Sequence, residues 1–392
     1  MATRLLIALL ISGLLAGTLP ALASAQSTRV QEKSDEQAEK AKALGVEGPS
    51  EAEVIVRRVL LSPLLSGPGG VYPWFGSVFG GSGMSAGIGG LKRLERMASL
   101  NGQAGMSING SMLLRGTFVA PELWRGMMHV DALAQWTKAN DVAFYGLGQH
   151  TVQENRTGYD YTPTEIGANV TIKPMRFVSF TGNYTYLGFS TELEESRPDS
   201  RAAGLERELD FHIARGTVAV DWRPAPAYST RGGFYRATFE QNQEAQGRPY
   251  SFTSQEYEVV QLVPLVREQF VLAFRGLMTL TSTDPEDIVP VVMAPYLGSG
   301  STLRGYANRR FTDRNRALMT GEYRWRPSRY MDMALFLDAG QVAPDHHFDL
   351  DEFDVAWGIG ARVHGPTFTA LRIELTRGRE GFRLVFAGSQ PF

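Results

Sequence analysis

Leu297-Gly-Ser-Gly-Ser-Thr-Leu-Arg-Gly-Tyr306 is the stretch on which the prediction of the fold depends. Its glycines and serines predict a loop between two strand-like segments, and its one cation is Arg304. The next two strand-like segments each contain an acid, Glu322 and Asp338, and alternation places each acid on the polar face of its strand. If the sheet closes into a barrel, that polar face lines the lumen, and Arg304 can pair there with both carboxylates.

Alternating apolar and polar residues predict that the C-terminal part of the chain is built of strands. Charges at every second position, such as Arg372 and Glu374, are costly inside a soluble sandwich but are tolerated in a wet lumen. In the last segment every second residue is apolar, and the terminal residue falls on the same parity: Phe382, Leu384, Phe386 and Phe392.

We therefore predict an all-β fold, a single transmembrane antiparallel β-barrel with an extracellular loop folded inward, over residues 71–392. A tilted strand that crosses the membrane takes about 10 residues, so this length leaves room for about 16 strands. Connections such as 327–330 are short and those such as 342–353 are longer, an asymmetry typical of outer-membrane barrels. An even number of strands returns the C-terminus to the periplasm.

The residues before the barrel are predicted to be a signal peptide, 1–25, and a short periplasmic tail, 26–70. A basic start precedes an apolar run, and Ala23-Ser-Ala25 supplies the small-x-small pattern before a cleavage site. The run is shorter than the roughly 20 residues of a spanning helix. The tail is shorter than a typical domain of about 50 residues or more. The expected location is the outer membrane of a Gram-negative-type bacterium.

Composition narrows the classes of function. The absence of cysteine excludes disulfides, thiolate catalysis and cysteine-ligated metals. The net charge of −2 argues against a nucleic-acid partner. We predict no cofactor and no specific metal site, because adjacent histidines in a polar loop, such as His346 and His347, are more often solvated than coordinating.

Gly83-Met-Ser-Ala-Gly87 matches the G-x-S-x-G pattern of serine hydrolases. A nucleophile elbow needs a strand before the serine and a helix after it, whereas glycine-rich, strand-like sequence lies on both sides here. We therefore predict that the protein is not an enzyme.

The C-terminal region resembles the bacterial surface antigen family, the BamA/TamA superfamily of outer-membrane assembly and translocation barrels. Weaker likeness extends upstream, so that the resemblance covers most of residues 140–392. The residues that carry it are Leu297 to Tyr306, Arg310-Phe-x-Asp313-Arg314, Glu322-Tyr-Arg324, Phe336-x-Asp338-x-Gly340, Trp357-Gly-Ile-Gly-Ala-Arg362 and the terminal phenylalanine.

The resemblance implies that a long loop folds back into a barrel of 16 strands. Arg304, Gly305 and Tyr306 then form the tip of that loop, and Glu322 and Asp338 form the wall that the tip contacts. We interpret these residues as a structural lock rather than a catalytic site, because buried ion pairs more often specify a conformation than perform chemistry.

The resemblance also implies that the last strand pairs imperfectly with the first, so that this junction can open sideways into the membrane. The residues Gly381, Leu384, Phe386 and Phe392 are similar to the C-terminal signal by which outer-membrane barrels are recognised for insertion. An ordinary last strand with an aromatic girdle residue explains most of the same positions.

Three functions remain open, in this order. The first is insertion or translocation of envelope proteins. The second is a passive pore or structural surface protein, because the chain has no room for the periplasmic polypeptide-transport-associated domains that assembly members of the family carry. The third is a surface lipid hydrolase that uses Ser85. The expected partners are outer-membrane lipid, envelope protein clients and a periplasmic protein that supplies the absent capture domain.

Overall fold

The computed structural model describes residues 70–94, 98–193, 204–205, 207–225, 228–266, 268–328, 330–365 and 369–392. The predicted signal peptide lies outside the described residues, and so does the predicted tail except for Gly70. Within these ranges, no helix combines the length and the apolar character that a membrane span requires.

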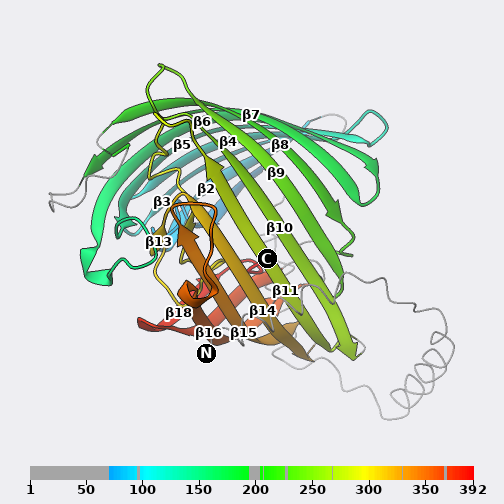
Figure 1. Cartoon of the computed structure of the whole chain (residues 1–392). Coiled ribbons are helices and arrows are strands. Elements are labelled where there is room, and N and C mark those ends of the chain that lie inside the picture. Colours follow the sequence, from blue (N-terminus) through cyan, green and yellow to red (C-terminus); the bar gives the residue numbers. More distant parts are fainter. Residues whose placement is uncertain are drawn as a thin grey trace, which may run out of the picture.

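A single antiparallel sheet of 16 strands forms the wall of a barrel, as predicted (Figure 1). Each strand pairs with its neighbour in the chain, except that β11 pairs with β14 across a long connecting loop. The strands are β1 (Gly70–Gly76), β2 (Ser85–Arg93), β3 (Ser99–Ser107), β4 (Met112–Leu123), β5 (Met128–Phe144), β6 (Thr157–Met175), β7 (Val178–Leu193), β8 (Glu208–Asp221), β9 (Gly232–Glu244), β10 (Phe252–Val266), β11 (Phe270–Ser282), β14 (Asn315–Ser328), β15 (Met331–Ala343), β16 (Asp354–His364), β17 (Thr369–Gly378) and β18 (Gly381–Ala387). Two short 3₁₀ helices lie in the connections, η2 (Gln153–Asn155) and η3 (Leu350–Glu352).

Side chains alternate between the lumen and the outer face of the wall. In β11 every second residue is buried on the lumenal side, and the residues between them are half-buried. Large apolar side chains such as Tyr184, Leu335 and Leu384 are exposed on the outer face. A lipid environment favours this distribution, because it solvates apolar side chains and leaves the polar ones to line the interior.

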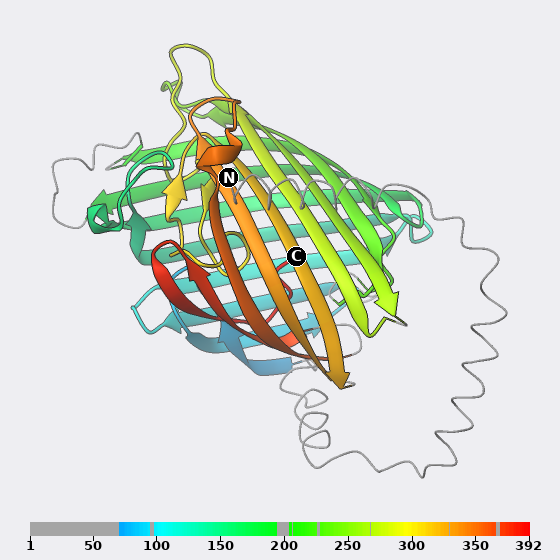
Figure 2. The ribbon, with the colours of Figure 1, turned by 60° about the horizontal axis from the view of Figure 1, so that its bottom comes forward.

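The connection between β11 and β14 folds into the barrel. It contains a two-stranded sheet of β12 (Tyr296–Leu297) and β13 (Phe311–Thr312). Figure 2 shows this segment in yellow beside the wall that β14 to β18 form in orange and red. One buried apolar cluster joins the loop to that wall: Leu277, Leu297, Leu303, Tyr306, Phe311, Leu318, Val342 and Ala356. The predicted inward fold of this loop is confirmed.

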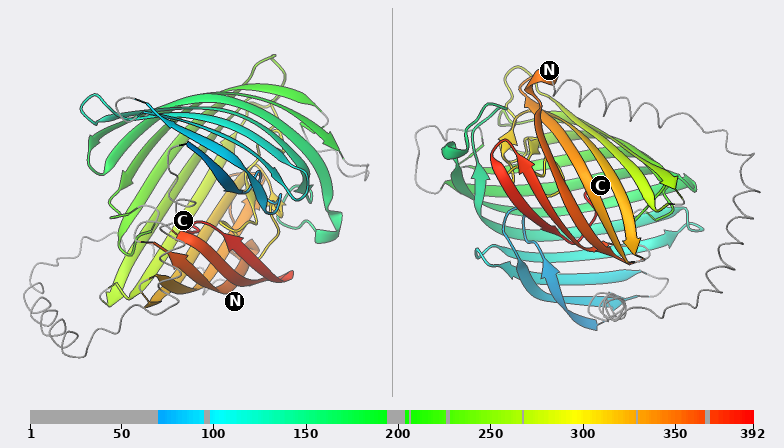
Figure 3. Two further views of the ribbon diagram at one scale, coloured as in Figure 1. Left: turned by 180° about the vertical axis from the view of Figure 1, so that it is seen from behind. Right: turned by 90° about the horizontal axis from the view of Figure 1, so that it is seen from below.

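The two ends of the hydrogen-bonded strand order are β1 and β18, and we call this junction the seam. Both strands are short, with seven residues each. Figure 3 shows them, in blue and red, on the same side of the molecule. The neighbouring β2 contains three glycines, Gly87, Gly89 and Gly90. Because glycine weakens a strand, the wall next to β1 is less strongly built than the C-terminal wall.

The last residues of the chain turn inward after β18 ends at Ala387. The ring of Phe392 lies over two lumenal guanidinium groups, 5.9 Å from that of Arg275 and 5.0 Å from that of Arg324. Gln390 accepts a hydrogen bond from Arg362. The parity that Phe392 shares with the last strand therefore does not set its position, since the strand stops before it and cations attract the ring into the lumen.

Candidate functional site

The tip of the inward loop is shaped by local backbone turns. Gly298 has a φ of +94°, and a β-carbon there would collide with the carbonyl oxygen of Ala307, so only glycine fits. The hydroxyl of Ser299 accepts hydrogen bonds from the amides of Ser301 and Thr302, both at 3.1 Å. These turns point the following residue, Arg304, at the barrel wall.

Arg304 is completely buried and is held by carboxylates on three sides. Its Nε and Nη2 each donate to a different oxygen of Asp338 at 2.8 Å, which is a bidentate pair. Its Nη1 donates to Glu322 at 2.6 Å. The guanidinium also lies 3.5 Å from the ring centroid of Phe336, so that an aromatic face covers it. The structure thus brings together Arg304 and the two acids to which the sequence pointed.

A third carboxylate, Glu374 on β17, also accepts from Arg304 Nη1, at 3.1 Å. Strand alternation predicted a lumenal position for Glu374 but did not assign this residue to the contacts of Arg304. Strand alternation shows which face of the sheet a residue occupies. The position along the barrel axis at which the loop contacts that face depends on tertiary packing, which the sequence pattern does not show. The parity of Glu374 was the one signal that could have found it.

Three more arginines surround the acids. Arg362 donates to both oxygens of Glu322, at 2.9 and 3.0 Å, and to Glu374 at 3.2 Å. Arg324 donates to Glu322 at 2.7 Å, and Arg372 donates to Glu374 at 2.8 Å. The charge cluster, as we call it, consists of Arg304, Arg324, Arg362, Arg372, Glu322, Asp338 and Glu374, and every member is buried. Shared carboxylates make it a network across β14 to β17.

Electrostatics keep the central cation charged. Burial alone would lower the pKa of the Arg304 guanidinium, but Asp338, Glu322 and Glu374 raise that pKa above its ordinary value. The guanidinium of Arg304 therefore stays protonated, and its contacts join the loop to the wall.

Gly305 and Tyr306 complete the contact with the wall. A β-carbon on Gly305 would lie 2.6 Å from that of Ala356 and 2.8 Å from the amide nitrogen of Gly378, so the backbone approaches as closely as a glycine permits. The hydroxyl of Tyr306 donates to Asp354 at 3.0 Å. Burial raises the pKa of this phenol, so it stays a hydrogen-bond donor.

Arg310, in the second half of the motif, ties the loop to distant parts of the chain. Its Nε pairs with Glu380 at 2.6 Å, next to the start of β18. Its Nη1 donates to the hydroxyl of Thr151 at 2.8 Å, in the connection between β5 and β6. Nearby, Gln149 donates to Asp354 at 2.6 Å. The loop therefore links the N-terminal and C-terminal halves of the barrel.

The predicted C-terminal signal residues do not share one environment. Gly381 has a φ of +121° in the turn that opens β18. Leu384 and Phe386 are exposed on the outer face, at 57% and 64% of their surface, whereas Phe392 lies inside. Their role as an insertion signal stays a prediction.

Two other sequence motifs lack the geometry of a reactive site. Ser85 is the first residue of a strand rather than the turn between a strand and a helix, and its hydroxyl accepts a hydrogen bond from the amide of Val78 at 3.2 Å. Near the two histidines of the long loop, His346 Nε2 lies 3.0 Å from the carbonyl oxygen of Thr281. Across the described ranges, no three His, Asp or Glu side chains lie close enough together to hold a metal ion.

Comparison with solved structures supports the same fold at low sequence identity. BamA from Haemophilus ducreyi lacking POTRA domains 1–3 matches with a TM-score of 0.60 and 12% identity, over 81% of this chain and 69% of that one. CdiB from Acinetobacter baumannii matches with a TM-score of 0.52 and 12% identity, over 77% and 56%. CdiB from Escherichia coli matches with a TM-score of 0.52 and 13% identity, over 82% and 60%. The chain thus spans little more than half the length of the two CdiB proteins.

A search of curated proteins gives no match. The Omp85 superfamily domain matches residues 111–379, a span that includes the inward loop and the whole charge cluster. That span is well over half of the chain. The protein is therefore a member of the Omp85 superfamily, a BamA/TamA-like β-barrel of the Gram-negative outer membrane.

Proposed function

We propose that this protein inserts or translocates envelope proteins, without an enzymatic step, by parting its wall at the seam. The observation that carries the proposal is the contrast between two weakly built edge strands, β1 and β18, and the charge cluster that braces β14 to β17. An edge strand offers unpaired N–H and C=O groups to another chain. A client strand can use those groups when the edges separate.

In this proposal the charge cluster is a structural lock. Arg304 joins Glu322 on β14, Asp338 on β15 and Glu374 on β17, so these strands resist separation from one another. Breaking a buried ion pair from one side is costly because it leaves an unpaired charge. Movement is thereby confined to the seam, where β1 and β18 are short and the neighbouring β2 is rich in glycine.

A disulfide across the seam tests the proposal, since the sequence has no cysteine of its own. Val71 lies near the start of β1 and Phe386 near the end of β18, and the antiparallel order puts both at the same end of the barrel, so cysteines at these positions are the candidate crosslink between the two edges. Leu375→Cys with Leu384→Cys is the control, because these residues already face each other in the β17–β18 ladder. In a strain that lacks the gene, the control pair should restore outer-membrane protein levels and secretion. The oxidised seam pair should not, until a reductant is added.

Unchanged outer-membrane protein levels and secretion after gene deletion would contradict the proposal. So would full activity of the oxidised seam pair. A periplasmic partner that supplies a capture domain belongs to the same proposal, and co-purification of such a protein from crosslinked cells is its test.

A passive pore is the second candidate, and one observation favours it. The lumen holds a cavity of about 460 Å³ between the loop and the wall of β6 to β11, with polar lining residues such as Asn183, Thr238 and Arg316. Steady conductance in planar bilayers would support a pore. The buried loop leads us to expect a closed barrel with brief openings at most.

A further inference from the structure

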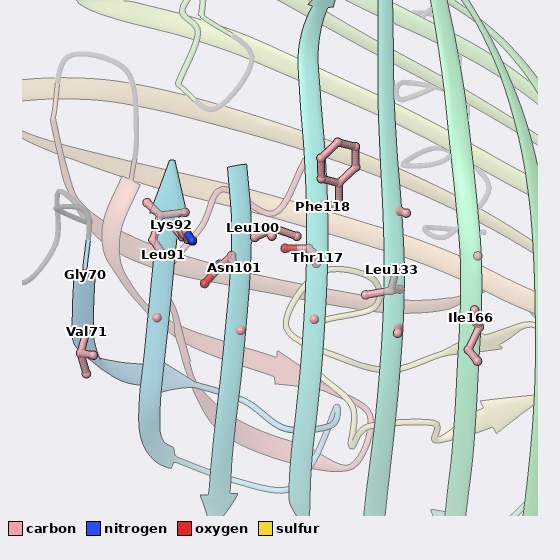
Figure 4. A pocket seen from close by; sticks show the side chains of 16 residues that line it. Gly70, Val71, Leu91, Lys92, Leu100, Asn101, Thr117, Phe118, Leu133 and Ile166 are labelled. Atoms are coloured by element: carbon pink, nitrogen blue, oxygen red, sulfur yellow. The ribbon is translucent and has the colours of Figure 1, made fainter. Parts of the chain in front are cut away.

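An apolar groove of about 690 Å³ crosses the outer face of β1 to β6 (Figure 4). Its floor is a row of small residues that face one another across neighbouring strands: Gly90, Gly102, Gly116 and Ala134. Three glycines in one cross-strand row leave a trough in a wall that elsewhere carries large apolar side chains.

These glycines are not needed for close packing. A β-carbon on Gly90 or Gly102 would meet no atom within 4 Å, and one on Gly116 would meet only the carbonyl oxygen of Ala134, at 3.9 Å. Gly87, which points inward from the same strand, differs because its β-carbon would collide with the backbone of Ala104. Since the outward glycines touch nothing, the space above them is open to an outside molecule.

Larger apolar side chains flank the row. Leu100 and Phe118 lie on one side, directly opposite each other in the β3–β4 ladder. Val71 and Ile166 stand at the two ends, and both are largely exposed, at 84% and 55%. From β1 to β6 the groove crosses five inter-strand spacings, or about 24 Å. A long, narrow, apolar space of this kind matches an extended hydrocarbon chain.

Among the residues that the structure describes, Lys92 is the one charged residue that lines the groove. It is exposed and pairs with Leu100 in the β2–β3 ladder, so it lies on the same outward face as the groove wall. It stands next to the end of β2, at the end of the barrel where β1 begins. A lysine in this position can lay its alkyl stem along the apolar wall and present its ammonium group to an anionic headgroup.

We propose that this groove binds one acyl chain of an anionic phospholipid, whose phosphate pairs with Lys92. The outer face of a membrane barrel is in contact with lipid, and the trough and its cation distinguish this position from the rest of that face. The groove ends at Val71, on the edge strand β1, so the bound chain lies directly beside the seam. The proposal concerns lipid binding and holds whether or not the barrel handles client proteins.

Native mass spectrometry of the full-length protein, released from micelles that contain phosphatidylglycerol and phosphatidylcholine with identical acyl chains, tests the proposal. The wild-type protein should retain one phosphatidylglycerol in preference to phosphatidylcholine. Lys92→Gln should reduce that preference about tenfold, the equivalent of one charge-assisted contact. The control is Lys138→Gln, at another exposed lysine outside the groove, which should leave the preference unchanged.

A second pair of variants tests the trough itself. Gly102→Leu with Gly116→Leu fills the groove at two facing positions. Gly182→Leu with Gly216→Leu is the matched control, because these glycines also face each other, also have open space above them and lie outside the groove. We expect retention of either lipid to fall in the first pair only, with both proteins showing the heat-modifiable mobility of a folded barrel.

Equal retention of the two lipids by the wild-type protein would overturn the proposal. Lipid retention that survives the groove-filling pair, or that falls equally in the control pair, would overturn it too. If the leucine pair does not fold, Gly102→Ala with Gly116→Ala makes the trough shallower at lower risk, and a graded loss of retention is then expected. The proposed lipid site would be contradicted if the folded alanine pair retained as much lipid as the wild-type protein and Lys92→Gln kept the wild-type preference for phosphatidylglycerol.

Discussion

The lumenal faces of the two halves of the barrel differ in charge. Between β6 and β7, neutral groups pair across the strands: Asn183 donates to Asn169 at 2.7 Å, and the hydroxyls of Thr171 and Thr181 lie 2.9 Å apart. From β9 onward, arginines pair with acids, as where Arg275 contacts Glu258 at 2.7 Å. The inward loop contacts both halves, through Leu303 and Tyr306 on the charged side and through Val289 and Val291 in a buried apolar cluster with β5 to β8.

Because of this difference, cross-strand contacts in one part of the sheet should resist movement more strongly than those in another part. A neutral hydrogen bond contributes about 1 kcal/mol, and water in the lumen can replace it when strands shift. A buried charge has no such substitute, so moving it away from its partner is costly. We therefore expect the charge cluster to brace the C-terminal half, and the N-terminal half to follow any movement at the seam.

The largest expected effect comes from removing an acid of the charge cluster. Asp338→Ala deletes both bonds to the Arg304 side chain and leaves a buried guanidinium underpaired, which should cost about 3–5 kcal/mol of unfolding free energy. Urea titration of the refolded barrel in detergent measures it. Asp131→Ala is the control in the other half, where the carboxylate is partly exposed, and should cost about 1 kcal/mol or less. Equal losses would remove the distinction between the halves.

Crowding the loop tip should have the next largest effect. Gly305→Ala forces a methyl group against Ala356 and the backbone of Gly378, which should cost about 1–3 kcal/mol and loosen the loop. Faster protease cleavage within 298–310 would report the loosening. Gly182→Ala, on the outer face with open space above it, should leave both stability and cleavage unchanged. A tip that tolerates the methyl group would show that its contact with the wall is not tight.

A smaller effect is expected at the C-terminus. Phe392→Ala removes a ring that contacts Arg275 and Arg324, and the loss should be about 0.5–2 kcal/mol, the range of a cation–π contact. Phe386→Ala is the matched control, because that ring is exposed on the outer face. Thermal unfolding in the same detergent compares them. A larger loss of thermal stability in Phe386→Ala than in Phe392→Ala would contradict a stabilising contact between Phe392 and the C-terminal half of the barrel.

The smallest effect is expected in the neutral ladder. Asn183→Ala removes a hydrogen bond to Asn169 in a lumen that water reaches, so the loss of unfolding free energy should be on the order of 1 kcal/mol or less.

Hydrogen exchange compares the two halves strand by strand. Backbone amides of β1 and β2 should exchange faster than those of β14 and β15. Equal protection across these strands would contradict a soft N-terminal wall.

Much of the fold could be predicted from the sequence, because a period of two residues assigns strand faces directly. The same alternation placed Glu322 and Asp338 on the lumenal face, and the loop carried one cation to meet them. Glu374 escaped assignment because the height of the loop in the lumen depends on tertiary contacts. The inward position of Phe392 could not be predicted, because parity has no meaning after the strand ends at Ala387.

The outer groove was beyond the reach of sequence patterns for a similar reason. Glycines at 90, 102 and 116 are separated in the chain by intervals that form no motif. Only the cross-strand register brings them into one row. The periodicity of one strand can be recognised in the sequence. A groove formed by residues of several strands can be recognised only when the register between those strands is known.

The position of Arg304 along the chain also constrains the order in which the barrel can be built. All three of its acidic partners come later in the sequence, and the last of them, Glu374, is 70 residues away. A polypeptide threaded from its N-terminus thus carries an unpaired guanidinium until β14 supplies Glu322 and β15 supplies Asp338. The three acids stand on one stretch of the wall, so the complete binding site for the loop tip exists only once β17 has joined that wall.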